Sequence, residues 1–115
     1  MKKLITAMFI FLSCFTSKAF SDGHAIKMGI ILGFTGPIES LTPAMAASAE
    51  LAFKEASDSG KLLGGKSIMI ERADSTCVDS AAATTAAEGL VSEGVLAIMG
   101  ADCSGVTGAI ATNVA

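Results

Sequence analysis

The sequence predicts an α/β fold in which a parallel sheet is flanked by helices. Three apolar segments of strand length alternate with Ala-rich segments of helical length, and strands and helices that alternate in this way form βαβ units. Hydrophobic residues make up 51% of the 115 residues and charged residues only 17%, which suits a packed interior rather than a disordered chain. We therefore expect right-handed crossovers between neighbouring parallel strands.

The first predicted unit is a strand over residues 25–34 followed by a helix that begins at Thr42. The near-continuous apolar run AIKMGIILGF is typical of a strand buried on both faces, and the turn signal TGP ends it. Thr42 is expected to cap the helix, with Pro43 as its first residue and Gly60 as its end. The face expected to be buried carries Met45, Ala49, Ala52 and Phe53.

The second unit repeats this pattern after the turn LGGK. Residues 67–74 alternate as a strand with Ile68 and Ile70 on one face. An Ala-rich segment follows, for which Asp79 is the expected cap and Gly94 the expected end.

The third unit is a strand over residues 95–100, a loop over 101–105 and a helix over 106–115. Small residues at the start of a helix expose backbone N–H groups, and the helix dipole adds partial positive charge there. Ser104 adds a hydroxyl group and Gly105 lets a ligand approach the backbone, so the loop is a candidate site for a carboxylate or a phosphate. The alternative is that Ser104 only caps the helix.

Signatures of catalysis are absent from the sequence. There is no G-x-G-x-x-G after the first strand, no phosphate loop and no G-x-S-x-G nucleophile motif. The single histidine, His24, precedes the first strand, far from any nucleophile loop. We expect no enzyme activity, no cofactor and no metal site, although a weaker alternative is a calcium site formed by Asp74, Asp79 and Asp102.

The N-terminal residues resemble a secretory signal. Two lysines precede an apolar run from Leu4 to Phe15, which as a helix would be about 18 Å long and too short to span a membrane. We expect residues 1–19 to be the signal peptide and residues 20–115 to be the exported part. Lipidation of Cys14 is the alternative to release by cleavage.

Export changes how the charge and the cysteines are interpreted. Without the signal peptide, five basic residues stand against eleven acidic ones, a net charge of −6 that argues against a nucleic-acid partner. Cys77 and Cys103 then remain in an oxidising compartment, which favours a disulfide bond between them. Two separately buried thiols are the alternative, and metal binding is less favoured.

An open parallel sheet of three strands whose last helix has no stop signal is not typical of a finished domain. We therefore expect the chain to be the N-terminal part of a larger lobe. Ligands of such sheets bind beyond the carboxyl ends of the strands, often in a crevice shared with a second unit.

From about Ile26 onward the ordered segments resemble the periplasmic substrate-binding proteins of ABC importers, in the branched-chain amino acid (Leu/Ile/Val) family. The segments that carry this resemblance are GFTGP, AELAFKEASDSGKLLGGK, SIMIERADSTCVDS and VLAIMGADCSG. The resemblance implies a type I two-lobed receptor in the periplasm, of which residues 20–115 begin lobe 1. It also implies a small-molecule ligand, an ABC permease in the inner membrane as partner, and a monomer when full length. It further implies a bridge from Cys77 to Cys103 and a ligand carboxylate held at Ser104.

Two positions depart from this family. Leu41 stands where family members often place an aromatic residue that faces the ligand, and Asp102 stands where an apolar or His residue is usual. Because a carboxylate beside an aliphatic side chain is costly unless paired, we expect a polar or cationic amino acid, or another small amide or acid, as ligand. The alternative function is an extracytoplasmic sensing domain of the same fold; an exported enzyme is a third choice.

Overall fold

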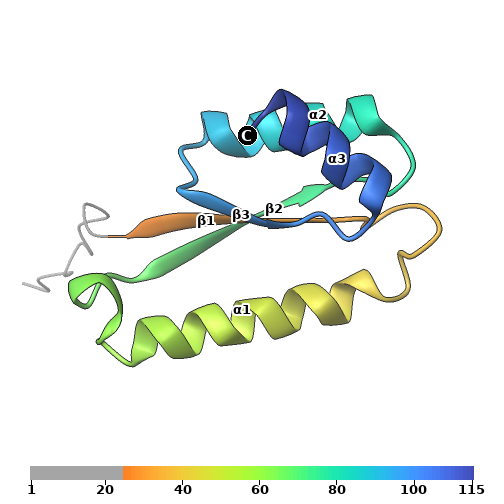
Figure 1. Ribbon diagram of the computed structural model, residues 1–115. Helices are drawn as coiled ribbons and strands as arrows, with labels where there is room; N and C mark the ends of the chain where they lie inside the picture. Colours follow the sequence, from red (N-terminus) through yellow and green to blue (C-terminus); the bar gives the residue numbers. More distant parts are fainter. Residues whose placement is uncertain (1–24) are drawn as a thin grey trace, which may run out of the picture.

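The computed structural model describes residues 25–115 (Figure 1). The predicted signal peptide, which includes Cys14, lies outside the described residues, and so does His24. The elements in chain order are β1 (Ile26–Leu32), α1 (Thr42–Asp58), a single turn of 3-10 helix, η2 (Leu62–Gly64), β2 (Ile68–Asp74), α2 (Ser80–Ser92), β3 (Ala97–Gly100) and α3 (Ser104–Asn113).

The three strands form a parallel sheet in the order β2-β1-β3. Helix α1 covers one face of this sheet, and helices α2 and α3 lie together on the other face (Figure 1). Right-handed crossovers produce this arrangement, because the connection from β1 to β2 and the connection from β2 to β3 run in opposite directions across the sheet. The predicted α/β class with a parallel sheet and flanking helices is confirmed.

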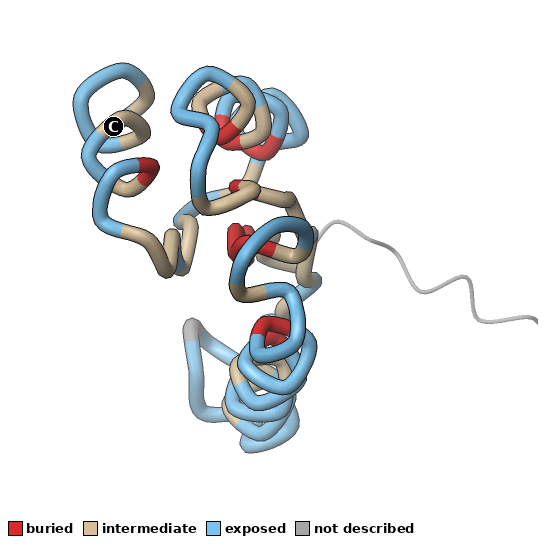
Figure 2. The backbone as a smooth tube through the Cα atoms, turned by 90° about the vertical axis from the view of Figure 1, so that its right-hand side faces the viewer, coloured by how far each residue is buried: buried red, intermediate tan, exposed pale blue. Residues whose placement is uncertain are grey.

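The central strand β1 supplies both halves of the core, because successive residues of a strand point to opposite faces. Ile30 and Leu32 pack against the α1 side together with Ala46, whereas Ile31 packs beneath α2 against Ala87 and Leu90. Figure 2 shows these buried positions in red along the inner sides of the helices and on the strands between them. The prediction of a first strand buried on both faces is confirmed for its second half.

Gly29 of β1 allows α2 to approach the sheet closely. A Cβ atom at this position would lie 2.9 Å from the Leu90 Cδ1 atom and 3.3 Å from the Ile98 Cγ1 atom. Leu90 is almost fully buried, at 3% exposure. A larger residue at position 29 would therefore force the Leu90 side chain to repack within the core or the helix to move away from the strand.

Helix α1 begins differently from the prediction. Its N-cap is Leu41, which makes no side-chain capping bond, and Thr42 is already helical. The fully buried Thr42 hydroxyl instead donates to the Gly33 carbonyl at 3.1 Å and lies 3.4 Å from the Glu39 carbonyl. The expectation that Thr42 caps the helix was wrong, because a hydrogen bond to the preceding loop competes with the capping bond.

The buried face of α1 is also rotated from the one predicted. Ala46, Ala49 and Phe53 pack against the sheet, whereas Met45 and Ala52 are exposed. The helix begins one residue earlier than predicted and ends at Asp58, before the predicted Gly60. In contrast, the prediction for α2 is confirmed at its start, where the Asp79 carboxylate accepts hydrogen bonds from the Ala81 and Ala82 N–H groups.

Candidate functional site

Three loops meet at the carboxyl edge of the sheet. The register pairs Leu32 of β1 with Asp74 of β2 and Ile31 of β1 with Gly100 of β3, so the residues that follow each strand lie next to one another. The chain turns to opposite faces after β1 and after β3, into α1 and α3 respectively (Figure 1). Ligands of open α/β sheets bind at such a switch point, outside the carboxyl ends of the strands.

A disulfide bond between Cys77 and Cys103 joins the loop after β2 to the loop after β3. The two Cα atoms are 5.3 Å apart, within the usual range for this bond. Of the alternatives that the sequence left open, the bridge is the one observed. It attaches the residue immediately before α3 to a neighbouring loop and thereby restricts where this helix begins.

Asp74, the last residue of β2, joins its own loop to the loop after β1. Its carboxylate accepts hydrogen bonds from the Thr35 hydroxyl at 2.6 Å, the Thr35 N–H group at 3.3 Å and the Thr76 N–H group at 2.8 Å. Burial raises the pKa of Asp74, but the hydrogen bonds to the ionised form together outweigh burial and hold the pKa below its ordinary value. Asp74 is therefore a loop anchor that stays charged at neutral pH.

Gly36 permits the close approach of these same two loops. Its φ of +96° lies in the left-handed region, and a Cβ atom there would lie 2.5 Å from the Thr76 carbonyl oxygen. Any other residue would both strain the backbone and separate the loops.

Asp102 lies between the three loops. Its two carboxylate oxygens are 3.0 Å and 3.2 Å from the Gly33 N–H nitrogen, and one of them is 3.5 Å from the hydroxyl oxygen of the fully buried Ser75. The Gly33 peptide is also held from the other side, because its carbonyl accepts the hydrogen bond from Thr42. The end of β1 is thus fixed by polar contacts to the loop after β3 and to α1.

Helix α3 begins earlier than predicted, at Ser104, and its N-cap is Cys103, with no side-chain capping bond. The reading in which Ser104 only caps the helix was therefore wrong: Ser104 is the first helical residue, and it is exposed. Gly105 is also exposed, and a Cβ atom there would meet no atom within 4 Å. The Thr107 hydroxyl lies 3.1 Å from the Ala101 carbonyl and 2.9 Å from the Cys103 carbonyl, so Thr107 holds the loop.

The remaining predicted site residue, Leu41, lies at the end of the loop after β1 and is 61% exposed. Sequence reasoning did not single out Gly33 or Ser75, and it gave Thr42 a different role, that of helix cap; all three hold the loops together. The only signal for them is their position just after a strand or just before a helix, and this does not reveal which partners they meet.

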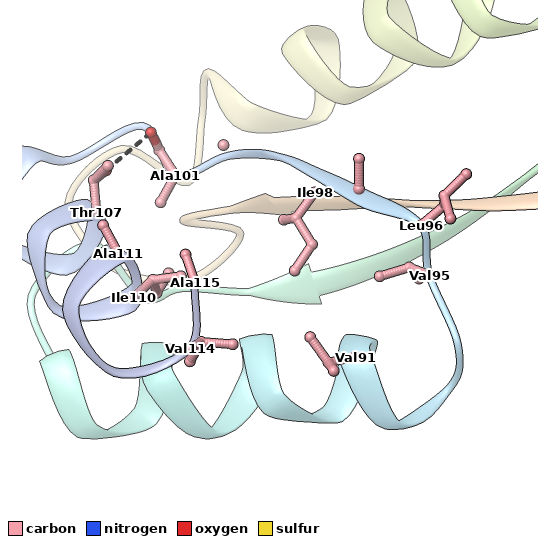
Figure 3. Close-up of a pocket in the computed structure, with 12 residues that line it drawn as sticks. Val91, Val95, Leu96, Ile98, Ala101, Thr107, Ile110, Ala111, Val114 and Ala115 are labelled. Carbon is pink, nitrogen blue, oxygen red and sulfur yellow. Dashed lines mark hydrogen bonds between the residues drawn. The ribbon is translucent and has the colours of Figure 1, made fainter.

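A hollow in the surface lies beside the edge of β3 that does not pair with β1 (Figure 3). Its volume is about 370 Å³, and its lining is largely apolar, with Val91 from α2, Ile98 from β3, and Ile110 and Val114 from α3. This groove follows the sheet edge, whereas the polar loops lie at the end of the strands.

Within residues 25–115, no group of three or more His, Cys, Asp or Glu residues is arranged to hold a metal ion. The three carboxylates considered for calcium have separate structural partners: Asp79 caps α2, Asp74 holds Thr35, and Asp102 holds Gly33. No helix in this part of the chain has both the length and the apolar character needed to cross a membrane.

A comparison with curated proteins finds no match. A comparison with protein families finds one described as periplasmic binding protein, whose model matches residues 25–115. The match extends from the start of β1 to the end of α3 and thus includes all three loops at the carboxyl edge of the sheet. The chain therefore belongs to the periplasmic binding protein family.

Proposed function

We propose that this chain is the first part of lobe 1 of a periplasmic receptor that binds an amino acid or a similar small polar solute and delivers it to an ABC importer. Membership of the periplasmic binding protein family supports a solute-binding role and a periplasmic location. The proposal includes no catalysis and no cofactor. Residues 1–19 act as the signal peptide, and the full-length receptor is a monomer.

The observation that carries the proposal is the way α3 begins. Its first residues, Ser104 and Gly105, are exposed at the switch point of the sheet, and no side chain within residues 25–115 accepts a capping bond from their N–H groups. The first N–H groups of a helix have no partner within the helix, and the helix dipole places partial positive charge on them. This arrangement suits a carboxylate group, the one group that all free α-amino acids share.

The neighbouring residues add a hydroxyl group and an apolar surface. The exposed Ser104 hydroxyl belongs to the first side chain of the helix, where it can donate to a ligand carboxylate oxygen. Leu41 exposes an aliphatic side chain on the loop after β1, which suits the carbon skeleton of a small solute. The disulfide bond and the Asp74 hydrogen bonds order the loops before the ligand arrives, which lowers the entropic cost of binding.

The groove along β3 supports the proposal that the lobe continues beyond α3. Helix α3 lies on the same face as α2, and a right-handed crossover on that face leads the chain to the free edge of β3 (Figure 1). A strand of about five to six residues there would pair with β3 and cover the apolar lining of the groove. A second lobe then closes over the ligand by a hinge motion and presents the closed form to the permease.

Isothermal titration tests the binding proposal directly. The protein expressed from its complete reading frame is titrated with a panel of neutral, cationic and acidic amino acids and with small amides. We expect heat of binding with at least one amino acid. The absence of heat with every amino acid, urea and amide refutes the proposed substrate class.

Two serine variants locate the site. Ser104→Ala removes the proposed hydroxyl donor, and a lost hydrogen bond to a charged group of about 1.5–3 kcal/mol weakens binding about ten-fold or more. Ser92→Ala is the matched control, because the Ser92 hydroxyl is exposed and donates only within α2, to the Glu88 carbonyl at 2.9 Å. Equal affinities of the two variants contradict a ligand contact at Ser104.

A further inference from the structure

Asp102 is the one predicted ligand residue whose functional group is already engaged with the protein. Both carboxylate oxygens lie within 3.2 Å of the Gly33 N–H nitrogen, and one is 3.5 Å from the Ser75 hydroxyl oxygen. An ionised carboxylate only accepts hydrogen bonds, and here donors from two different loops occupy it. The hydrogen bonds of the carboxylate are thus directed to the residues that follow β1 and β2.

These contacts connect every loop of the candidate site. Asp102 belongs to the loop after β3, Gly33 directly follows β1, and Ser75 directly follows β2 with its side chain fully buried. Asp102 also directly precedes Cys103, the N-cap of α3 and one end of the disulfide bond. The disulfide ties this loop to the loop after β2, and Asp102 adds the only side-chain bond among the described residues that ties it to the end of β1.

The disulfide bond alone does not fix the position of the loop after β1 relative to the start of α3. It holds the start of α3 close to Cys77. The loop after β1, which carries Leu41, is attached to the start of α3 directly through the Gly33–Asp102 contact, and indirectly through the Asp74–Thr35 hydrogen bonds and the disulfide. The distance between Leu41 and Ser104 is the width of the proposed ligand site. A carboxylate that bridges the two loops sets this width.

We propose that Asp102 is a positioning residue that fixes the loop after β1 relative to the start of α3, and that it is not a contact for a cationic ligand group. This inference rests on the proposed function, because it assigns a role within the same binding site. It also removes the basis for expecting a cationic solute from the presence of Asp102. Selectivity for charge then depends on other groups.

Affinities for two amino acids of different charge show whether Asp102 positions the loops or contacts a cationic ligand group. L-leucine and L-lysine, which share the α-carboxylate and differ in side-chain charge, are titrated into the wild-type protein and into Asp102→Ala and Asp102→Asn. Loss of the Asp102–Gly33 contact lowers the affinity for every ligand that binds by a similar factor, about ten-fold or more for the alanine variant. The asparagine variant retains one acceptor oxygen for the Gly33 N–H group and therefore loses less affinity than the alanine variant. Selective loss of L-lysine with both variants overturns the inference and makes Asp102 a ligand contact.

Hydrogen exchange at the Gly33 amide gives a readout that needs no ligand. Without the Asp102 acceptor, this amide exchanges faster in Asp102→Ala than in the wild-type protein. The exchange rate in Asp102→Asn lies between these two rates. Unchanged exchange at Gly33 overturns the inference. If the wild-type protein binds no amino acid, the proposed function is refuted, and the Gly33 exchange alone decides whether Asp102 holds the loops.

Leu90→Ala controls for a general loss of stability. Leu90 is a buried residue of α2 that packs against the sheet, away from the three loops, so its truncation destabilises the fold without removing a contact at the site. The positioning role requires that Asp102→Ala weakens binding more than Leu90→Ala does at the same or smaller decrease in the midpoint of thermal unfolding. Equal weakening at equal destabilisation shows that Asp102 is merely structural and overturns the inference.

Discussion

Replacing Gly105 by alanine is expected to stabilise the protein and, at the same time, weaken ligand binding. Gly105 is the second residue of α3 and is exposed. A Cβ atom at this position meets nothing within 4 Å, so the new methyl group causes no clash in the absence of a ligand. The methyl group occupies space that a ligand carboxylate needs if it approaches the N–H groups at the start of the helix.

The size of the stabilisation follows from helix propensity. Glycine in a helix is less favourable than alanine by about 0.5–1 kcal/mol, because glycine loses more backbone freedom on folding. Gly105→Ala therefore raises the midpoint of thermal unfolding by about 1–4 °C. The change in binding has the opposite sign: a methyl group that prevents one hydrogen bond to a charged carboxylate costs about 1.5–3 kcal/mol, or about ten-fold or more in affinity.

Gly108→Ala is the matched control for this experiment. Gly108 lies three residues further along α3, is exposed, and likewise has no atom within 4 Å of an added Cβ. The Gly108→Ala variant should gain a similar amount of stability and bind the ligand with unchanged affinity. Both variants are measured by thermal unfolding without ligand and by isothermal titration with whichever amino acid the wild-type protein binds. If Gly105→Ala binds as tightly as Gly108→Ala, the ligand does not approach the start of α3 and the proposed site is wrong.

Three further predictions concern the loops and the sheet edge. Serine at both Cys77 and Cys103 should lower the free energy of unfolding by about 3.5 kcal/mol, from the loop-entropy relation for cysteines separated by 26 residues, and an unchanged urea midpoint would contradict this. The pKa of Asp74 is lower in the folded protein than in the unfolded chain, so its contribution to stability is present above the unfolded pKa and is lost as the pH falls through the folded pKa. Urea unfolding at several pH values should therefore show Asp74→Asn less stable than wild type at neutral pH, with the difference shrinking as the solution becomes acidic; a constant difference would exclude this linkage. Leu96→Gln should destabilise the product of the complete reading frame by more than the ±0.5 kcal/mol typical of surface changes, because a strand added beside β3 would bury this side chain, here 73% exposed. Leu51→Gln on α1, at 56% exposure, should stay within that range, and equal effects of the two would argue against the added strand.

Local sequence signals were most reliable where one residue determines the backbone by itself. Asp79 accepts two N–H hydrogen bonds at the start of α2, as its side chain and position predicted. Thr42 looked equally suitable as a cap, but its hydroxyl bonds to Gly33, nine residues away. The two cases differ because a tertiary partner was available to Thr42, and no local pattern indicates such a partner.

The sequence by itself determined the α/β class and the order of the elements, because apolar periodicity acts locally. It favoured a bond between Cys77 and Cys103, and the structure shows this bond. Only the tertiary structure decided what the polar residues at the strand ends do. Asp102 reaches Gly33, 69 residues away, and Asp74 reaches Thr35, 39 residues away, because parallel pairing brings the strand ends together. Which donor meets which carboxylate depends on the register and on the face each helix covers, and these are properties of the packed sheet rather than of any single segment.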